Sequence, residues 1–206
     1  MQEHQVTIGG ETHFVPDPFL VMATQNPIET EGTYPLPEAQ VDRFMMKVVI
    51  DYPSERDEYV IVERNTSSTL EVRPVMTTQQ LRDLQGEVEK TYIDPALIEY
   101  AVRLATATRE PDRFGIKDIS QYILYGTSPR ASINFIVTAR ALAYVRGRNY
   151  ALLEDVMDMA MDVMRHRLVL SYEAMSDNIT SDEIIKRVMD RVPIPAQPLK
   201  THVEVA

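Results

Sequence analysis

The sequence predicts a short α/β segment followed by an all-α domain. Two apolar runs without alternation, residues 19–23 and 44–50, are typical of strands that are buried on both faces of a sheet. From Ser54 onward, residues that cap helices repeatedly precede apolar residues at helical spacing. The change of pattern near residue 53 therefore separates a segment with strands from a helical remainder.

A hairpin is predicted ahead of the two apolar runs. Residues 6–8 and 12–14 flank Gly9 and Gly10, and glycines allow the positive φ angles of a tight turn. The two buried strands cannot form a stable sheet by themselves, because isolated strand pairs are marginal in water.

Six helices are predicted after residue 53, each opened by a residue whose side-chain oxygen can accept a hydrogen bond from a first-turn N–H group. Thr77 and Thr180 also have the spacing of a capping box, whereas Asp94 and Ser128 precede a proline at the first helical position. The six opening residues are Ser54, Thr77, Asp94, Ser128, Asp155 and Thr180. The helix after Ser128 is expected to end at Gly147 and carries Ile133, Ile136, Val137, Leu142 and Val145.

Composition excludes several classes of function. The chain has 21 Lys and Arg against 31 Asp and Glu, a net charge of −10, which is unsuited to a broad surface for nucleic acid. It contains no cysteine, and its histidines lack the spacing of metal ligands, so no metal site is expected. No apolar run approaches the length of about 20 residues that a membrane span requires. The sequence therefore indicates a cytoplasmic protein without a membrane span.

Two polar residues beside the predicted strands are candidates for binding phosphate. Asn26 follows the run at residues 19–23, at the edge where open α/β sheets bind ligands, but Asn-Pro also begins turns. Arg43 precedes the run at residues 44–50 and could donate to phosphate, but beside Asp42 it could equally form a surface ion pair. From pattern alone, the turn and the ion pair are the favoured interpretations.

Arg130 is the residue whose position is most informative. It lies in the first turn of a predicted helix, where the helix dipole disfavours a cation and backbone N–H groups are free. A cation and free N–H groups at one place make a local anion site, although Arg130 could also lie along the surface. None of the 7 glycines belongs to the phosphate-binding pattern G-x-x-x-x-G-K-[ST], so the chain lacks the usual phosphate cradle.

Three stretches of the chain form extended motifs. Residues 23–44 contain ATQNPIE and EGTYPLPEAQVDRF, residues 126–131 read GTSPRA, and residues 165–174 contain RHR and SYEA. Together with residues 1–10, they resemble the MoxR family of AAA+ ATPases over most of the chain, up to about Ala174. From position alone, the RHR triplet is read as basic residues that complement the carboxyl end of a helix.

The resemblance implies a role for each candidate. Asn26 would be the first sensor, whose amide positions the water that attacks the γ-phosphate of ATP. Arg43 would be the arginine finger, which reaches into the ATP site of a neighbouring subunit, and Arg130 would be the second sensor. The resemblance further implies ATP and Mg²⁺ as cofactors and a ring, expected to be a hexamer. It also implies chaperone-like activation of partners, among them proteins with von Willebrand factor type A domains.

The resemblance also implies a division of the chain and a longer parent protein. Residues 1–66 would be the carboxyl-terminal part of the AAA+ core, residues 77–175 the helical lid, and residues 176–206 a final helix and loose tail. Because the family's phosphate loop and acidic metal-binding strand are absent, we expect the chain to be part of a longer ATPase and inactive alone. Two alternatives remain open: a non-enzymatic helical interaction module, and a chelatase-like motor for metal insertion.

Overall fold

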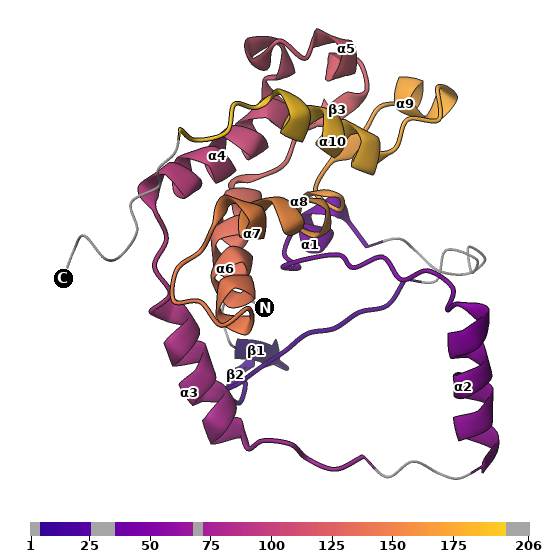
Figure 1. Cartoon of the computed structure of the whole chain (residues 1–206), viewed down its shortest axis with the longest axis vertical. Helices are drawn as coiled ribbons and strands as arrows, with labels where there is room; N and C mark the ends of the chain where they lie inside the picture. Colours follow the sequence, from indigo (N-terminus) through magenta and orange to yellow (C-terminus); the bar gives the residue numbers. More distant parts are fainter. Residues whose placement is uncertain (1–4, 26–35, 68–71, 197–206) are drawn as a thin grey trace.

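The computed structural model describes residues 5–25, 36–67 and 72–196. Its hydrophobic core lies between residues 93 and 192, and none of the described residues before Thr91 is buried. Figure 1 shows α2 set apart from the helical domain. The elements ahead of the core are β1 (Gln5–Ile8), β2 (Glu11–Phe14), α1 (Glu38–Val41), α2 (Glu55–Ser67) and α3 (Thr78–Glu89).

The predicted hairpin is confirmed. β1 and β2 pair antiparallel, with Gln5 opposite Phe14 and Ile8 opposite Glu11. Gly9 and Gly10 form the turn with φ angles of +60° and +91°, a region of backbone conformation that favours glycine.

The two predicted buried strands are not strands in the structure. Residues 19–23 and 44–50 form no ladder with any described residue, and Leu20, Met22 and Ile50 are exposed. An apolar run becomes a strand only where a neighbouring strand offers backbone hydrogen bonds, and no described segment does so here. Residues 42–47 instead lie against the helical domain, as shown below.

The helical domain holds the core. Helix α6 packs against α4, α7 and α8, and α10 packs against α4 and α8, so the final helix shares this core. Two short strands, β3 and β4, pair antiparallel, and Figure 1 shows β3 beside α10. The elements are α4 (Pro95–Arg109), η1 (Pro111–Phe114), α5 (Lys117–Ser120), β3 (Ile123–Tyr125), α6 (Pro129–Val145), α7 (Leu153–Asp158), α8 (Ala160–Met164), β4 (Val169–Leu170), α9 (Tyr172–Ser176) and α10 (Ser181–Arg191).

Five of the six predicted helix starts are confirmed by cap hydrogen bonds. The side chains of Ser54, Thr77, Asp94, Ser128 and Thr180 each accept a hydrogen bond from a first-turn N–H group. Asp155 is the exception, because it lies inside α7 and its carboxylate accepts the N–H of Leu152 at 2.8 Å. The stretch that it was expected to open is two short helices, α7 and α8.

The buried face of α6 differs from the expected one. Ile133, Val137 and Val145 are exposed, whereas the residues buried along the helix are mainly small. Small side chains let α6 approach its neighbours closely, so the core does not need the larger residues. The buried residues are Ala131, Phe135, Thr138, Ala139 and Ala143. None of the described helices is long and apolar enough to cross a membrane.

Candidate functional site

Two of the three predicted site residues lie beside the same carboxylate. Nη1 of Arg130 donates to Oδ2 of Asp42 at 2.9 Å, and Arg43 directly follows Asp42 in the turn after α1. Asn26 lies outside the described residues. The structure thus brings the segment that carries Arg43 to the helix that carries Arg130.

The loop before α6 is fixed to the end of α4. The N–H group of Thr127, which is fully buried, donates to Oγ1 of Thr108 at 2.9 Å, and Nη1 of Arg109 donates to the carbonyl of Thr127 at 2.7 Å. Gly126 lies so close that an added Cβ would be 2.5 Å from the carbonyl oxygen of Thr108. A glycine at residue 126 is therefore needed for this close approach, which sets where α6 begins.

Ser128 joins the amino end of α6 to Asp42. Its hydroxyl accepts the N–H of Arg130 at 3.2 Å and donates to the carboxylate of Asp42, with oxygen distances of 2.8 and 3.0 Å. A carboxylate is stabilised at a helix amino end by the helix dipole. At the amino end of α6, where an anion site was predicted around Arg130, the structure places the carboxylate of Asp42, and the binding of an anion from outside the chain stays a prediction.

Arg167 approaches the same carboxylate from the other side. Its side chain is fully buried, and its Nε lies 3.2 Å from Oδ1 of Asp42, whose own side chain is 16% exposed. Nη2 donates to the carbonyls of Asp42 and Phe44, and Nη1 donates to those of Met45 and Val163. The bond to Val163, at the end of α8, confirms the interpretation as a helix complement, but the bonds to residues 42–45 were not predicted.

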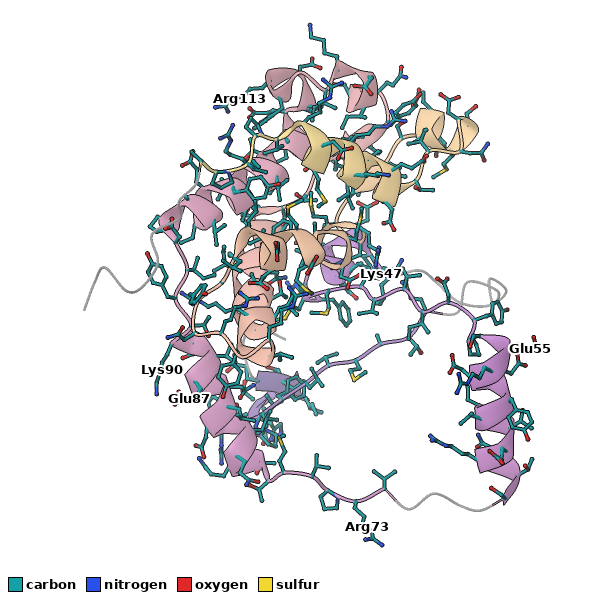
Figure 2. All side chains as sticks on the ribbon, viewed as in Figure 1. Lys47, Glu55, Arg73, Glu87, Lys90 and Arg113 are labelled. Atoms are coloured by element: carbon teal, nitrogen blue, oxygen red, sulfur yellow. The ribbon has the colours of Figure 1, made fainter. Side chains whose placement is uncertain are left out.

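The two residues before Arg167 bind the same stretch of backbone. Nε2 of His166 donates to the carbonyl of Phe44 at 3.1 Å, and Nη1 of Arg165 donates to that of Lys47 at 2.9 Å. The N–H group of Lys47 in turn donates to the carbonyl of Asp162 at 2.8 Å. Figure 2 shows Lys47 on the connection that follows α1. We call residues 165–167 the clamp and residues 42–47 the docked segment.

Burial and neighbouring charge set the protonation of the clamp. Burial lowers the pKa of Arg167, and the carboxylate of Asp42 opposes that shift. Burial, together with the positive charge of Arg167, lowers the pKa of His166 from 6.5 to about 4. His166 is therefore neutral near pH 7 and carries its proton on Nε2, because the carbonyl of Phe44 can only accept a hydrogen bond.

The backbone on both sides of Arg43 is hydrogen-bonded to the clamp, whereas the Arg43 side chain takes no part in this contact. Its side chain is exposed and forms no ion pair or hydrogen bond with the described part of the chain. The interpretation of Asp42 and Arg43 as a surface ion pair is wrong, because Asp42 pairs with Arg130 and Arg167 instead. Arg43 thus presents a permanently charged group that can bind an anion brought by another molecule.

Sequence reasoning missed the residues that assemble the site. Arg130 and Asp42 are 88 positions apart, and Arg167 and Asp42 are 125 positions apart, so no local spacing indicates their contact. The available signals were an aspartate beside the candidate arginine and a basic triplet at residues 165–167.

This contact lies outside two open depressions in the described part of the chain. Two open depressions of about 530 and 620 Å³ lie along α4, and neither is lined by Asp42, Arg43 or Arg130. Among the described residues, no group of three His, Asp or Glu could hold a metal ion.

Comparison with known proteins assigns the two sides of this contact. Residues 1–46 match the family model "ATPase family associated with various cellular activities (AAA)", and residues 117–188 match "AAA lid domain". Asp42 and Arg43 belong to the first match, whereas Ser128, Arg130 and the clamp belong to the second. The contact therefore joins an AAA segment to an AAA lid.

Several relatives resemble nearly the whole chain. Chaperone MoxR1 of Mycobacterium tuberculosis is 46% identical over 95% of the chain and 52% of its own length, and protein YeaC of Bacillus subtilis is 37% identical over 96% and 59%. Protein MoxR of Paracoccus denitrificans is 31% identical over 85% and 56%. A crystal structure from Cytophaga hutchinsonii, described as an ATPase, has a TM-score of 0.89 at 41% identity, covering 95% of this chain and 60% of that one. The chain thus spans about half to three fifths of the proteins that it matches.

Proposed function

The chain belongs to the MoxR family of AAA+ ATPases, and from this premise we propose that it is the carboxyl-terminal part of an ATPase with chaperone-like activity on partner proteins. The observation that carries the proposal is the ion pair between Arg130 and Asp42. This contact places the start of the lid beside the segment that carries Arg43. In a motor, such an arrangement lets a movement of the lid change the contact between Arg43 and phosphate.

Arg43 acts as the arginine finger of a ring, which we propose to be a hexamer. Its exposed guanidinium is available to a phosphate in the neighbouring subunit, while Asp42 and Phe44 on either side are held by the lid. An arginine finger stabilises the charge that develops on the transferred phosphoryl group, and in GTPase systems it accelerates turnover by roughly 10³- to 10⁵-fold.

Arg130 acts as the second sensor. Its Nη1 already binds a carboxylate oxygen, and the same planar donors suit a phosphate oxygen, so the residue fits ATP. Pairing with Asp42 and contact with phosphate compete for this donor, which would link the lid to the state of the nucleotide.

Asn26 is proposed as the first sensor, because a side-chain amide can orient an attacking water. ATP, when bound with Mg²⁺, supplies the phosphoryl group that is transferred. Among the described residues, no cluster of three or more Asp, Glu or His side chains could hold the metal, so we place its ligands elsewhere in the parent protein. Because the sequence has no G-x-x-x-x-G-K-[ST] pattern, the 206 residues alone are expected to bind ATP weakly or not at all and not to hydrolyse it.

The partners of the full-length protein are proposed to be proteins that it assembles or activates, including ones with von Willebrand factor type A domains. This part of the proposal rests on the family and on the name of one relative, Chaperone MoxR1.

The test is Arg43→Ala in the full-length protein. We expect ATP turnover to be lost while the Kd for ATP stays close to that of the wild type, because the finger acts on the neighbour's phosphate and not on binding. Arg113→Ala is the matched control, since Arg113 is also exposed and Figure 2 shows it away from Lys47 of the docked segment. Loss of ATP binding in Arg43→Ala, with normal turnover per bound ATP, would contradict the proposal.

A further inference from the structure

We propose that Arg167, supported by His166, is a positioning residue for Arg43. The inference rests on the proposed function, because it assumes that Arg43 serves a neighbouring ATP site. It assigns to the clamp a task beyond lid stability: the clamp fixes the backbone from which the finger extends.

Arg167 donates hydrogen bonds to backbone carbonyls on both sides of Arg43 in the sequence. Nη2 donates to the carbonyl of Asp42 at 3.1 Å and to that of Phe44, and Nη1 donates to that of Met45 at 3.2 Å. One guanidinium thus holds the residues immediately before and after the finger. His166 adds a second donor to the carbonyl of Phe44.

Arg167 cannot take part in the chemistry directly. Its side chain is fully buried in the interface between the docked segment and the lid, whereas Arg43 is exposed. Its influence on turnover must therefore pass through the backbone of residues 42–45. Burying a guanidinium is costly unless its donors are satisfied, and here most of the donors are used on the backbone beside the finger.

The proposed role of Arg167 requires the forked guanidinium group of arginine. A lysine at the same position keeps the charge and the pairing with Asp42 but offers a single nitrogen, which cannot span the carbonyls of residues 42, 44 and 45 at once. A displacement of the finger by about 1 Å can reduce turnover by about 10²-fold. Arg167→Lys in the full-length protein should therefore lower kcat by about that factor, with a much smaller change in KM for ATP.

Mixing subunits shows which ATP site is affected. Arg43→Ala subunits keep their own site but provide no finger, and Asn26→Ala subunits provide a finger but have a defective site. Their mixture should be more active than the sum of the two alone. Arg167→Lys should behave as a finger defect, so it should regain activity with Asn26→Ala subunits and not with Arg43→Ala subunits.

The outcomes separate this inference from the proposed function. If Arg43→Ala and Asn26→Ala do not complement each other, the finger role itself fails, and the inference fails with it. If they do, but Arg167→Lys regains activity with Arg43→Ala and not with Asn26→Ala, Arg167 serves the ATP site of its own subunit and the inference alone is overturned.

A milder variant covers the case in which Arg167→Lys does not fold. His166→Leu introduces an apolar side chain of similar size and removes the N–H group that donates to the carbonyl of Phe44. It should show the same complementation pattern with a smaller loss of kcat, and thermal unfolding should confirm assembly. An unchanged kcat in a folded His166→Leu ring would reject the role of the clamp.

Discussion

Arg130 and Asp42, 88 positions apart in the sequence, form an ion pair with a nitrogen–oxygen distance of 2.9 Å. Asp42 also accepts a hydrogen bond from Ser128 and lies 3.2 Å from Nε of Arg167. One carboxylate therefore gathers a helix cap and two arginines from the lid. The residue that follows it is Arg43, so the lid contacts the docked segment at the position beside the residue that we propose as the finger.

Gly126→Ala should destabilise the protein. The new Cβ would lie 2.5 Å from the carbonyl oxygen of Thr108, so the loop before α6 would have to move away from α4. Overpacking of this kind costs about 1–3 kcal/mol. Chemical denaturation should show a lower free energy of unfolding than in the wild type.

Gly86→Ala is the matched control for that substitution. Gly86 lies inside α3, and an added Cβ would meet nothing within 4 Å. Alanine is favoured over glycine in a helix interior by about 0.8–1 kcal/mol, so the control should be neutral or stabilising. Equal effects of the two substitutions would show that the close approach at Gly126 is unimportant.

Asp155→Asn should destabilise the helical domain. The fully buried carboxylate pairs with Arg146 at 2.9 Å and Arg148 at 2.6 Å, and it caps the N–H of Leu152. Burial alone would raise the pKa of Asp155, but its hydrogen bonds from Arg148 and Leu152 outweigh burial and lower it. Asparagine lacks the charge and one acceptor, so donors of the partly exposed Arg146 and Arg148 lose their partner, and we expect a loss of about 1–3 kcal/mol, which urea unfolding can measure.

The exposed ion pair between Arg113 and Glu110 provides the contrast. Both side chains are more than half exposed, so Glu110→Gln should change the free energy of unfolding by less than about 1 kcal/mol. An effect of Glu110→Gln as large as that of Asp155→Asn would contradict the importance given to burial.

His166 should make the stability of the docked segment depend on pH. Its pKa is lowered from 6.5 to about 4 in the folded state, so between these values the unfolded chain binds the proton more readily. This contribution is therefore fully present above pH 6.5 and is lost as the pH falls toward 4. Protonation would also place a second N–H group at Nδ1, a buried atom without a hydrogen-bond partner.

Thermal unfolding between pH 7 and pH 4 measures this contribution. His166→Gln should flatten the dependence of Tm on pH, whereas His13→Gln, on the exposed strand β2, should leave it unchanged. The same slope in His166→Gln and the wild type would show that His166 is not the titrating group.

The 206-residue chain should associate with itself at high concentration. Ile50 is 87% exposed and Tyr52 is 91% exposed, and α2 exposes Tyr59, Ile61 and Val62. Exposed apolar side chains gathered on neighbouring segments favour association. Light scattering after size exclusion should show a mass that rises with concentration, whereas a constant monomer mass would contradict this expectation.

The fold could be predicted where its signals are local. The caps at Thr77, Asp94 and Thr180 were predicted because a cap depends on residues two or three positions apart. The runs at residues 19–23 and 44–50 could not be predicted, because an apolar run becomes a strand only beside a partner.

The same distinction applies to the site. Arg130 could be singled out from its place in a first helical turn, but its anion could not, since Asp42 is far away in the sequence. Arg167 looked like a helix-end residue because its contact with Val163 is local, while its contacts with residues 42–45 are not. Contacts between distant segments depend on the whole fold rather than on any one motif.

A double-mutant cycle between Asp42 and Arg130 tests most directly whether the lid and the docked segment are energetically coupled. Asp42→Asn, Arg130→Gln and the double variant should be compared in the full-length protein for free energy of unfolding and for kcat. We expect the two substitutions to be non-additive, with a coupling free energy within the range of about 0.5–3 kcal/mol found for residues in contact. Effects that add to within about 0.3–0.5 kcal/mol in both measurements would contradict the account.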